Sequence, residues 1–131
     1  MRLPLTLVVE GPTDASVLKR LLAEAGLLVG PEYVKNGKPA LDQSLAGYNN
    51  AARFSPWLVL RDLNSDDLCA PALRRRLLSS PSKHMRLHIA VREMEAWLLA
   101  DVGALCQFLR VPQRDVPHNP EEVEKPKHAL V

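Results

Sequence analysis

Carboxylates follow two apolar segments of this sequence, and their types and positions are those of a metal site. Glu10 follows the apolar run 3–9, and an acidic run at 62–67 follows the apolar run 57–60. Short apolar runs closed by Gly, Pro or acidic residues are typical of strands buried on both faces. The carboxyl ends of such strands form the ligand-binding edge of open α/β sheets, and neighbouring strands lie about 4.8 Å apart. We therefore expect Glu10 and Asp62 to approach one bound ion.

A divalent cation is the ligand that this acidic group predicts. Converging carboxylates repel one another and raise each other's pKa, which destabilises a fold unless a cation neutralises them. Asp14 lies in the first turn of a predicted helix and faces back toward the same edge, while Asn64 and Asp66 offer further oxygen atoms. Oxygen ligands without a soft ligand nearby suit Mg²⁺ or Mn²⁺ rather than Zn²⁺.

Simpler interpretations exist for each acidic feature taken alone. Glu10 can be a solvated strand end, and Asp66 or Asp67 can be the N-cap of the helix that follows. The occurrence of both features at matching ends of two apolar strands favours the metal site.

A calcium EF-hand loop is a third interpretation of the acidic run, and the sequence excludes it. Asp62, Asn64 and Asp66 match the alternating ligands of such a loop. The loop also needs Gly at its sixth position and Glu at its twelfth, and here these positions hold Asp67 and Leu73.

The elements that must position these residues alternate along the chain. We predict strands at 3–9, 27–34, 57–60 and 85–91. We predict a helix that ends at Gly26 and further helices near 41–54, 68–78 and 93–109. Such alternation implies one α/β domain of 131 residues, with a parallel or mostly parallel sheet flanked by helices. Residues 112–126 carry four prolines and many charges, which predicts a loop or an extended arm.

Several side chains have two interpretations at this level. Thr13 or Asp14 is expected to cap the first helix. Trp97 is expected in the core, as part of an apolar stripe with Met94, Leu98, Leu105 and Phe108.

The consecutive arginines 74–76 form either a solvated helix face or contacts to phosphates. Glu93 and Glu95 fall on opposite sides of their predicted helix, so at most one should point at the site. Glu95 is either a ligand or the ion-pair partner of Arg92 or another arginine.

Composition narrows the classes of protein without naming one. The chain is 47% hydrophobic and 24% charged, which suits a globular domain. Its net charge of +2 argues against a purely basic DNA-binding module. Cys69 and Cys106 form no metal-binding spacing and are expected to be reduced. The sequence has no signal-peptide pattern and no apolar run as long as a membrane span, so we expect a cytoplasmic protein without a membrane partner.

The sequence resembles a Toprim domain, the fold shared by topoisomerases, bacterial primases, recombination proteins and OLD-family nucleases. The resemblance rests on Glu10-Gly11-Pro12-Thr13-Asp14 before an amphipathic helix and on Asp62-Leu63-Asn64 after a strand. The run Glu95-Ala96-Trp97-Leu98-Leu99-Ala100-Asp101, with Lys125-Pro126-Lys127 downstream, is similar to a bacterial family of unknown function among the Toprim-like, OLD-type proteins. The resemblance covers nearly the whole chain.

The resemblance implies roles for individual residues. Glu10 matches the Glu that serves Toprim enzymes as a metal ligand or general acid/base, and Asp14 matches the second acid of the OLD-type motif. Asp62 matches the first Asp of Asp-x-Asp, whereas Asn64 stands where the fold has the second Asp and brings an oxygen but no charge. Asp66 or Asp67 can compensate for that charge. Glu95 matches the acid after the fourth strand, and Lys127 the late lysine of OLD-type nucleases.

These observations lead to three hypotheses. The first is a Mg²⁺- or Mn²⁺-dependent nuclease that cleaves phosphodiesters of DNA or RNA, with Glu10, Asp62 and Lys127 as catalytic residues. The second is a catalytically degenerate Toprim-like module that binds nucleic acid or regulates another protein, which Asn64 and the small net charge favour. The third is that the chain is the structured part of a longer protein, since it stops at Leu130-Val131 within a predicted helix.

Overall fold

A four-stranded parallel sheet forms the centre of the protein, which is described by a computed structural model over residues 3–130. Its strands are β1 (Leu5–Val9), β2 (Val29–Val34), β3 (Trp57–Asp62) and β4 (Met85–Ala90). They lie in the order β2-β1-β3-β4, and each neighbouring pair is parallel. The predicted α/β class is confirmed, and the arrangement is consistent with a Rossmann-like, Toprim-type fold.

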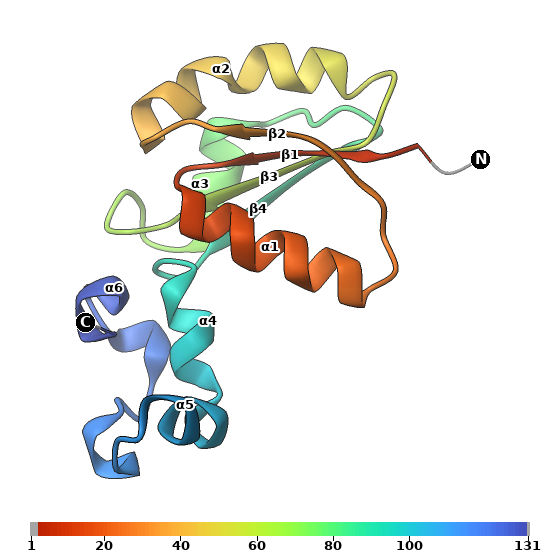
Figure 1. Ribbon diagram of the computed structural model, residues 1–131. Helices are drawn as coiled ribbons and strands as arrows, with labels where there is room; N and C mark the ends of the chain where they lie inside the picture. The colour runs from red at the N-terminus through yellow and green to blue at the C-terminus, as the bar shows by residue number, and fades with distance from the viewer. Residues whose placement is uncertain (1–2, 131) are drawn as a thin grey trace.

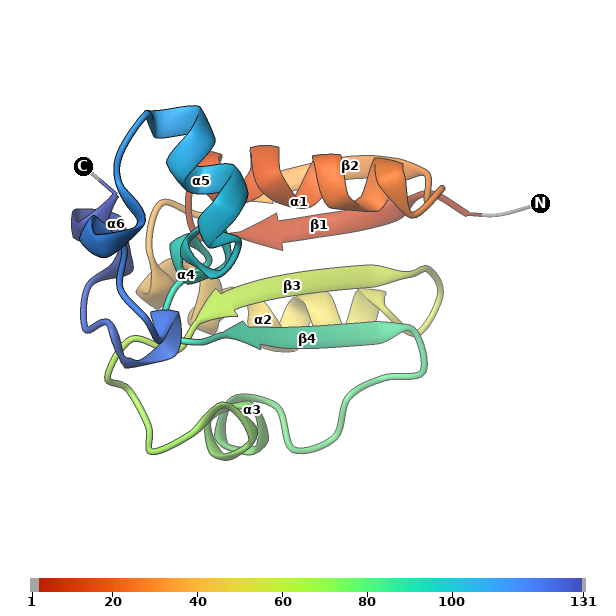
Figure 2. The same ribbon diagram turned by 90° about the horizontal axis from the view of Figure 1, so that it is seen from below.

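Helices cover both faces of the sheet, because alternate residues of each buried strand point to opposite faces. Leu7 and Val9 of β1 pack with Leu18 of α1 (Pro12–Glu24), on the face below the sheet in Figure 1. Val8 lies between them and packs with Leu41 of α2 (Lys38–Ala51) on the opposite face. A third helix, α3 (Ala70–Leu77), lies beside β4, as Figure 2 shows.

The first two helices begin earlier than predicted, for reasons visible in their backbones. Helix α1 begins at Pro12, and the side chain of Asp14 caps it by accepting the N–H of Gly11 at 3.0 Å. Gly26 follows the helix with a φ of +73°, so the predicted glycine stop is confirmed. Helix α2 begins at Lys38 because Gly37, with a φ of +132°, turns the chain and Pro39 suits a first helical turn.

The predicted single helix over 93–109 is wrong, because the chain forms α4 (Glu95–Ala100) and α5 (Val102–Leu109). Asp101 separates them with non-helical backbone angles, and its side chain accepts the N–H of Ala104 at 3.3 Å. A short acidic side chain that bonds to nearby backbone favours a helix start over a helix interior. The predicted apolar stripe is also incorrect, since Trp97 is 39% exposed and Phe108 is 85% exposed.

The capping role predicted for Asp66 or Asp67 is wrong as well. Helix α3 begins at Ala70 and is preceded by Cys69, so both acids lie too far upstream to cap it. Asp67 instead accepts hydrogen bonds from the N–H of Leu68 and from Arg76. Leu73 is fully buried, as expected for the inward face of this helix.

The segment after α5 is neither a simple loop nor an extended arm. It forms η1 (Gln113–Asp115), η2 (Pro120–Glu122) and α6 (Pro126–Ala129), and both η2 and α6 pack against α4. Pro126 is fully buried, which holds α6 against the rest of the fold. Figure 2 shows α4, α5 and α6 gathered beyond the carboxyl ends of the strands. Val131, where the predicted terminal helix breaks off, lies outside the described residues. Among the helices of residues 3–130, none is both long and apolar enough to cross a membrane.

The two-sided core makes a stability prediction. Leu41 is fully buried between α2 and the sheet, so we expect Leu41→Ala to lower the free energy of unfolding by about 2–5 kcal/mol. Urea denaturation measures this change. Leu68→Ala is the matched control, because Leu68 is 99% exposed and its truncation should leave stability nearly unchanged. Equal effects of the two substitutions would contradict the described core.

Candidate metal centre

An acidic pocket of about 420 Å³ opens at the carboxyl edge of the sheet. It receives residues from the ends of β1, β2 and β3, from the start of α1, from the α4 region and from α6. Its lining consists of Glu10, Gly11, Asp14, Asn36, Gly37, Asp62, Asn64, Glu93, Glu95 and Lys127. The pocket therefore combines segments from nearly the whole length of the chain.

Three carboxylates converge most closely within this pocket. Asp14, Asp62 and Glu95 each offer an oxygen, and these oxygens lie within 4.8 Å of one another. The side chains of Asp14 and Glu95 are buried, and that of Asp62 is half-buried. We call these three residues the acidic triad.

The backbone holds each member of the triad in place. Asp62 ends β3 on the same face as Leu58 and Leu60, which pack under α1, and its Oδ1 accepts the N–H of Met94 at 3.0 Å. Asp14 accepts the N–H of Gly11 and so stays at the start of α1. Glu95 begins α4, directly after the fully buried Met94. Helix starts also favour negative charge, which supports Asp14 in its helix.

Glu10 joins β1 to β3 at the rim of the triad. Its Oε2 accepts the backbone N–H of Asp62 at 2.7 Å, which confirms that the tips of the two strands lie together. Glu10 lines the pocket but is outside the closest group of three oxygens. The two acids expected to form the main pair are therefore in contact through the backbone N–H of Asp62. The carboxylate oxygens that converge with that of Asp62 belong to Asp14 and Glu95.

The electrostatics of the pocket disfavour ionised carboxylates. Burial, followed by repulsion from Glu10 and Asp14, raises the pKa of Asp62 to about 8. Burial and repulsion from Glu95 raise the pKa of Asp14 to about 6. Burial also raises the pKa of Glu10, despite the hydrogen bond from the backbone of Asp62 and the charge of Arg61. These acids hold protons at a pH where ordinary carboxyls are ionised, so the positive charge near them, including that of Lys127, does not compensate for theirs.

Asn64 lines the pocket in a turn that directly follows β3. Its φ of +50° lies in the left-handed region, which Asn tolerates better than most residues. Its N–H donates to the carbonyl of Arg92 at 2.8 Å, so the turn is tied to the chain after β4. The residue contributes an amide rather than a charge to the pocket.

Asp66, expected as a metal ligand, lies apart from the triad. It forms ion pairs with Lys38, at 2.7 Å, and with Arg61, and it does not line the acidic pocket. Slight burial tends to raise the pKa of Asp66, but hydrogen bonds from Lys38 and Arg61 outweigh it and lower this pKa below its ordinary value. Arg61 precedes Asp62 and therefore points to the opposite face of β3, where it also pairs with Asp42 at 2.8 Å. Asp66 thus balances a buried guanidinium.

The segment around α6 returns Lys127 to the pocket. Its Nζ lies 3.8 Å from Oε1 of Glu95, and its backbone N–H donates to Oε2 of Glu93 at 3.2 Å. Glu93 and Glu95 both line the pocket, so the expectation that only one could face it is wrong. Helix α4 begins at Glu95, and Glu93 precedes it, so the two residues do not share a helix. Glu95 pairs with Lys127 rather than with Arg92 or another arginine.

Four lining residues were not among the predicted site residues: Gly11, Asn36, Gly37 and Glu93. Asn36 and Gly37 follow β2 and both have positive φ values. An Asn-Gly pair directly after a strand signals a turn at the ligand-binding edge, so the sequence did contain a usable signal. Glu93 lacked such a signal, because its placement depends on where α4 begins.

The donor chemistry of the pocket fits a hard divalent cation. Within the described residues, its lining includes five carboxylates (Glu10, Asp14, Asp62, Glu93 and Glu95) and one ammonium group, that of Lys127. Oxygen donors without sulfur or imidazole in this lining suit Mg²⁺ or Mn²⁺. Comparison with protein-family models, curated proteins and solved structures finds no match to the chain.

The raised pKa values predict how stability depends on pH in the presence of a chelator. The folded protein keeps protons on Asp14 up to about pH 6 and on Asp62 up to about pH 8, whereas their ordinary pKa is 3.8. The folded state therefore binds more protons than the unfolded state between these values. We expect the free energy of unfolding to fall as pH rises from about 4 to about 8, as measured by urea denaturation in EDTA.

Asp62→Asn should flatten this pH profile, because it removes a carboxyl whose pKa is raised to about 8. Asp67→Asn is the matched control, since Asp67 lies outside the pocket and has a pKa lowered by Arg76 and the N–H of Leu68. A wild-type stability that rises with pH across this window would contradict the described electrostatics.

Proposed function

We propose that the protein is a Toprim-like nuclease that hydrolyses phosphodiester bonds of DNA or RNA with the help of Mg²⁺ or Mn²⁺. The observation that carries this proposal is the acidic triad, in which oxygens of Asp14, Asp62 and Glu95 converge within 4.8 Å at the carboxyl edge of a parallel sheet. Buried carboxylates converge in this way at a cost in stability, which a bound cation removes.

The triad would hold the cation, with Glu10 and the amide oxygen of Asn64 at its rim. A bound Mg²⁺ or Mn²⁺ would supply positive charge beside the phosphate and lower the pKa of the attacking water. Glu10 is held at the rim by the backbone N–H of Asp62, and burial raises its pKa, so it is a more effective proton acceptor than an ordinary exposed carboxylate. Asp66 has no place in this scheme, because Lys38 and Arg61 occupy it on the other side of β3.

Lys127 would neutralise charge that develops on the phosphate. Its side chain is 66% exposed and reaches the pocket beside Glu95, so its ammonium is accessible to an incoming phosphate. A lysine placed in this way stabilises negative charge in the transition state and restrains the substrate.

A degenerate module that binds nucleic acid or regulates another protein is the second candidate. Asn64 favours it, since this residue lines the pocket without contributing the charge of the Asp expected there. Such a module would not cleave nucleic acid with either cation, which separates it from the first candidate.

Substitution of the pocket acids tests the nuclease proposal. We expect Glu10→Gln and Asp62→Asn each to lower the rate of cleavage of plasmid and single-stranded substrates by about a hundredfold or more, because each removes a charge from the proposed cation site. Rates are measured in Mg²⁺ and in Mn²⁺. Asp67→Asn should cut like wild type, since it removes a nearby acid from outside the pocket. If wild type does not cut, or cuts no faster than both pocket variants, the proposal is lost.

Binding of the cation has a separate readout in protein stability. At pH 8, Mn²⁺ at a hundredfold excess over its Kd should raise the free energy of unfolding by about 2.7 kcal/mol relative to EDTA. The gain should shrink strongly in Asp62→Asn and persist in Asp67→Asn. Equal stabilisation of all three proteins would place the cation elsewhere.

A further inference from the structure

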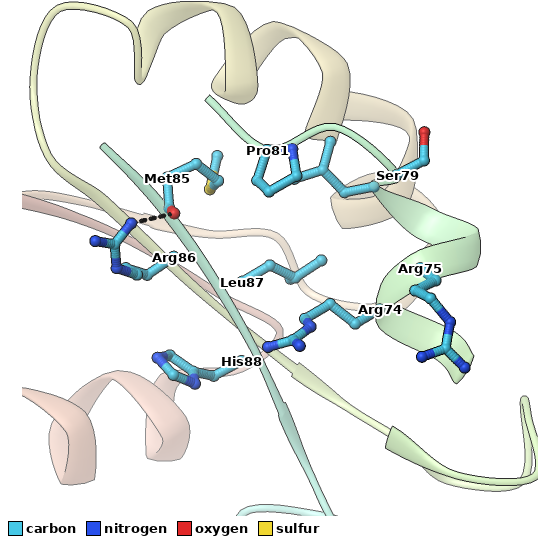
Figure 3. Close-up of a pocket in the computed structure, with 9 residues that line it drawn as sticks. Arg74, Arg75, Ser79, Pro81, Met85, Arg86, Leu87 and His88 are labelled. Atoms are coloured by element: carbon cyan, nitrogen blue, oxygen red, sulfur yellow. Dashed lines mark hydrogen bonds between the residues drawn. The ribbon is translucent and has the colours of Figure 1, made fainter. Parts of the chain in front are cut away.

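A groove of about 360 Å³ runs along the free edge of β4, outside the acidic pocket. Strand β4 is the last strand of the sheet on this side, so its outer edge pairs with no other strand among the described residues. Figure 3 shows Arg86 and His88 projecting from β4 and Arg74 reaching from α3 toward His88, while Arg75 extends from the same helix. All four side chains are exposed.

The arginines of this groove lack acidic partners in the described part of the chain. No carboxylate lines the groove there. Within residues 3–130, Arg86 donates only to backbone carbonyls, those of Lys83 and Met85, and neither Arg74 nor Arg75 forms an ion pair. Arg76 is the contrast within the same helix, because Asp67 binds it at 3.0 Å. Of the three consecutive arginines, Arg76 is therefore neutralised by Asp67, while the charges of Arg74 and Arg75 remain available in the groove.

His88 reports the local electrostatic field. Partial burial, followed by repulsion from Arg74 and Arg86, lowers the pKa of this histidine. Among the described residues the groove is lined by three arginines and no carboxylate, so it is locally positive although the whole chain has a net charge of only +2. Such local concentration of positive charge attracts anions even where the global charge is small.

The groove leads toward the acidic pocket. A second hollow shares Arg74 and His88 with it and extends to Ile89. The next residue of β4, Ala90, is the register partner of Asp62. The distance from His88 to Ala90 along a strand is about 7 Å. A ligand in the groove therefore lies close to the end of β3 that carries the triad.

We propose that this groove binds the phosphate backbone of a nucleic acid strand through Arg74, Arg75 and Arg86. The inference rests on the proposed function for the kind of ligand, and it adds the place at which that ligand is held. An acidic pocket repels phosphates, so an anion-binding surface beside it supplies attraction that the pocket lacks. Guanidinium groups suit phosphates because their N–H groups match two phosphate oxygens at once.

Binding without cleavage tests the proposal. The probes are fluorescent duplex DNA and its single strand, and anisotropy is measured in EDTA at several KCl concentrations. We expect Arg74→Ala/Arg86→Ala to weaken duplex binding roughly tenfold at low salt. The slope of log K against log[KCl] should become shallower by roughly 1.8, since each lost duplex phosphate contact removes about 0.9.

Two matched variants control for charge and for folding. Arg20→Ala/Arg114→Ala removes the same net charge from arginines outside the groove and should bind like wild type. Arg74→Lys/Arg86→Lys keeps the charge and should retain most of the salt dependence. Circular dichroism should be unchanged throughout, because Arg74 and Arg86 are exposed.

The outcomes separate this proposal from the nuclease proposal. If wild type binds neither probe, or if both double-alanine variants bind alike, the groove proposal is overturned. An acidic peptide as the natural partner would produce the first of these results. If binding depends on Arg74 and Arg86 but no cleavage occurs with Mg²⁺ or Mn²⁺, the groove stands while the nuclease proposal fails.

Discussion

The parallel pairing of β1 with β3 is the constraint on which the pocket depends. Register places Thr6, Leu7 and Val8 beside Trp57, Leu58 and Val59, and the pair ends with the backbone N–H of Asp62 bound to Glu10. A shift of one residue would turn Asp62 to the opposite face of the sheet. The apolar residues before it fix the register, because Leu58 and Leu60 must face α1 while Val59 must face α2. Packing of these core residues therefore determines the direction in which the Asp62 carboxylate points.

The sheet also separates two groups of acids, although Asp62 of the first group and Asp66 of the second lie close together in sequence. On one face, Asp62 meets Asp14 and Glu95 with little positive charge nearby. On the other, Asp42 and Asp66 surround the buried guanidinium of Arg61. The second group is electrostatically satisfied and suits a structural role, since a buried charge needs partners. The first group is not satisfied, which is the physical reason for placing a cation there.

Local sequence patterns predicted the strands and their acidic ends well. Glu10 and Asp62 follow apolar runs, and parallel topology brings such ends together, so their meeting could be inferred without coordinates. The side of β3 on which Asp66 lies could not, because it depends on the left-handed turn at Asn64 and on ion pairs with distant residues.

The break between α4 and α5 and the return of the chain to the pocket at α6 were equally hard to predict. The interruption at Asp101 results from a side-chain hydrogen bond that competes with helix, and apolar periodicity carries no sign of it. The return of Lys127 depends on the burial of Pro126 against the rest of the fold. Prolines and charges in the preceding segment suggested an extended arm, since local composition does not reveal tertiary packing.

The return of α6 has a consequence for the order of events during synthesis. Glu10 emerges from the ribosome near the beginning and Lys127 near the end of the described chain, yet both line one pocket. Domains generally fold as units, and contacts between distant segments form late because loop closure costs entropy. A nascent chain that has already formed β1 through β4 still lacks one wall of the pocket. Completion of the site is thereby coupled to synthesis and docking of the segment that contains α6.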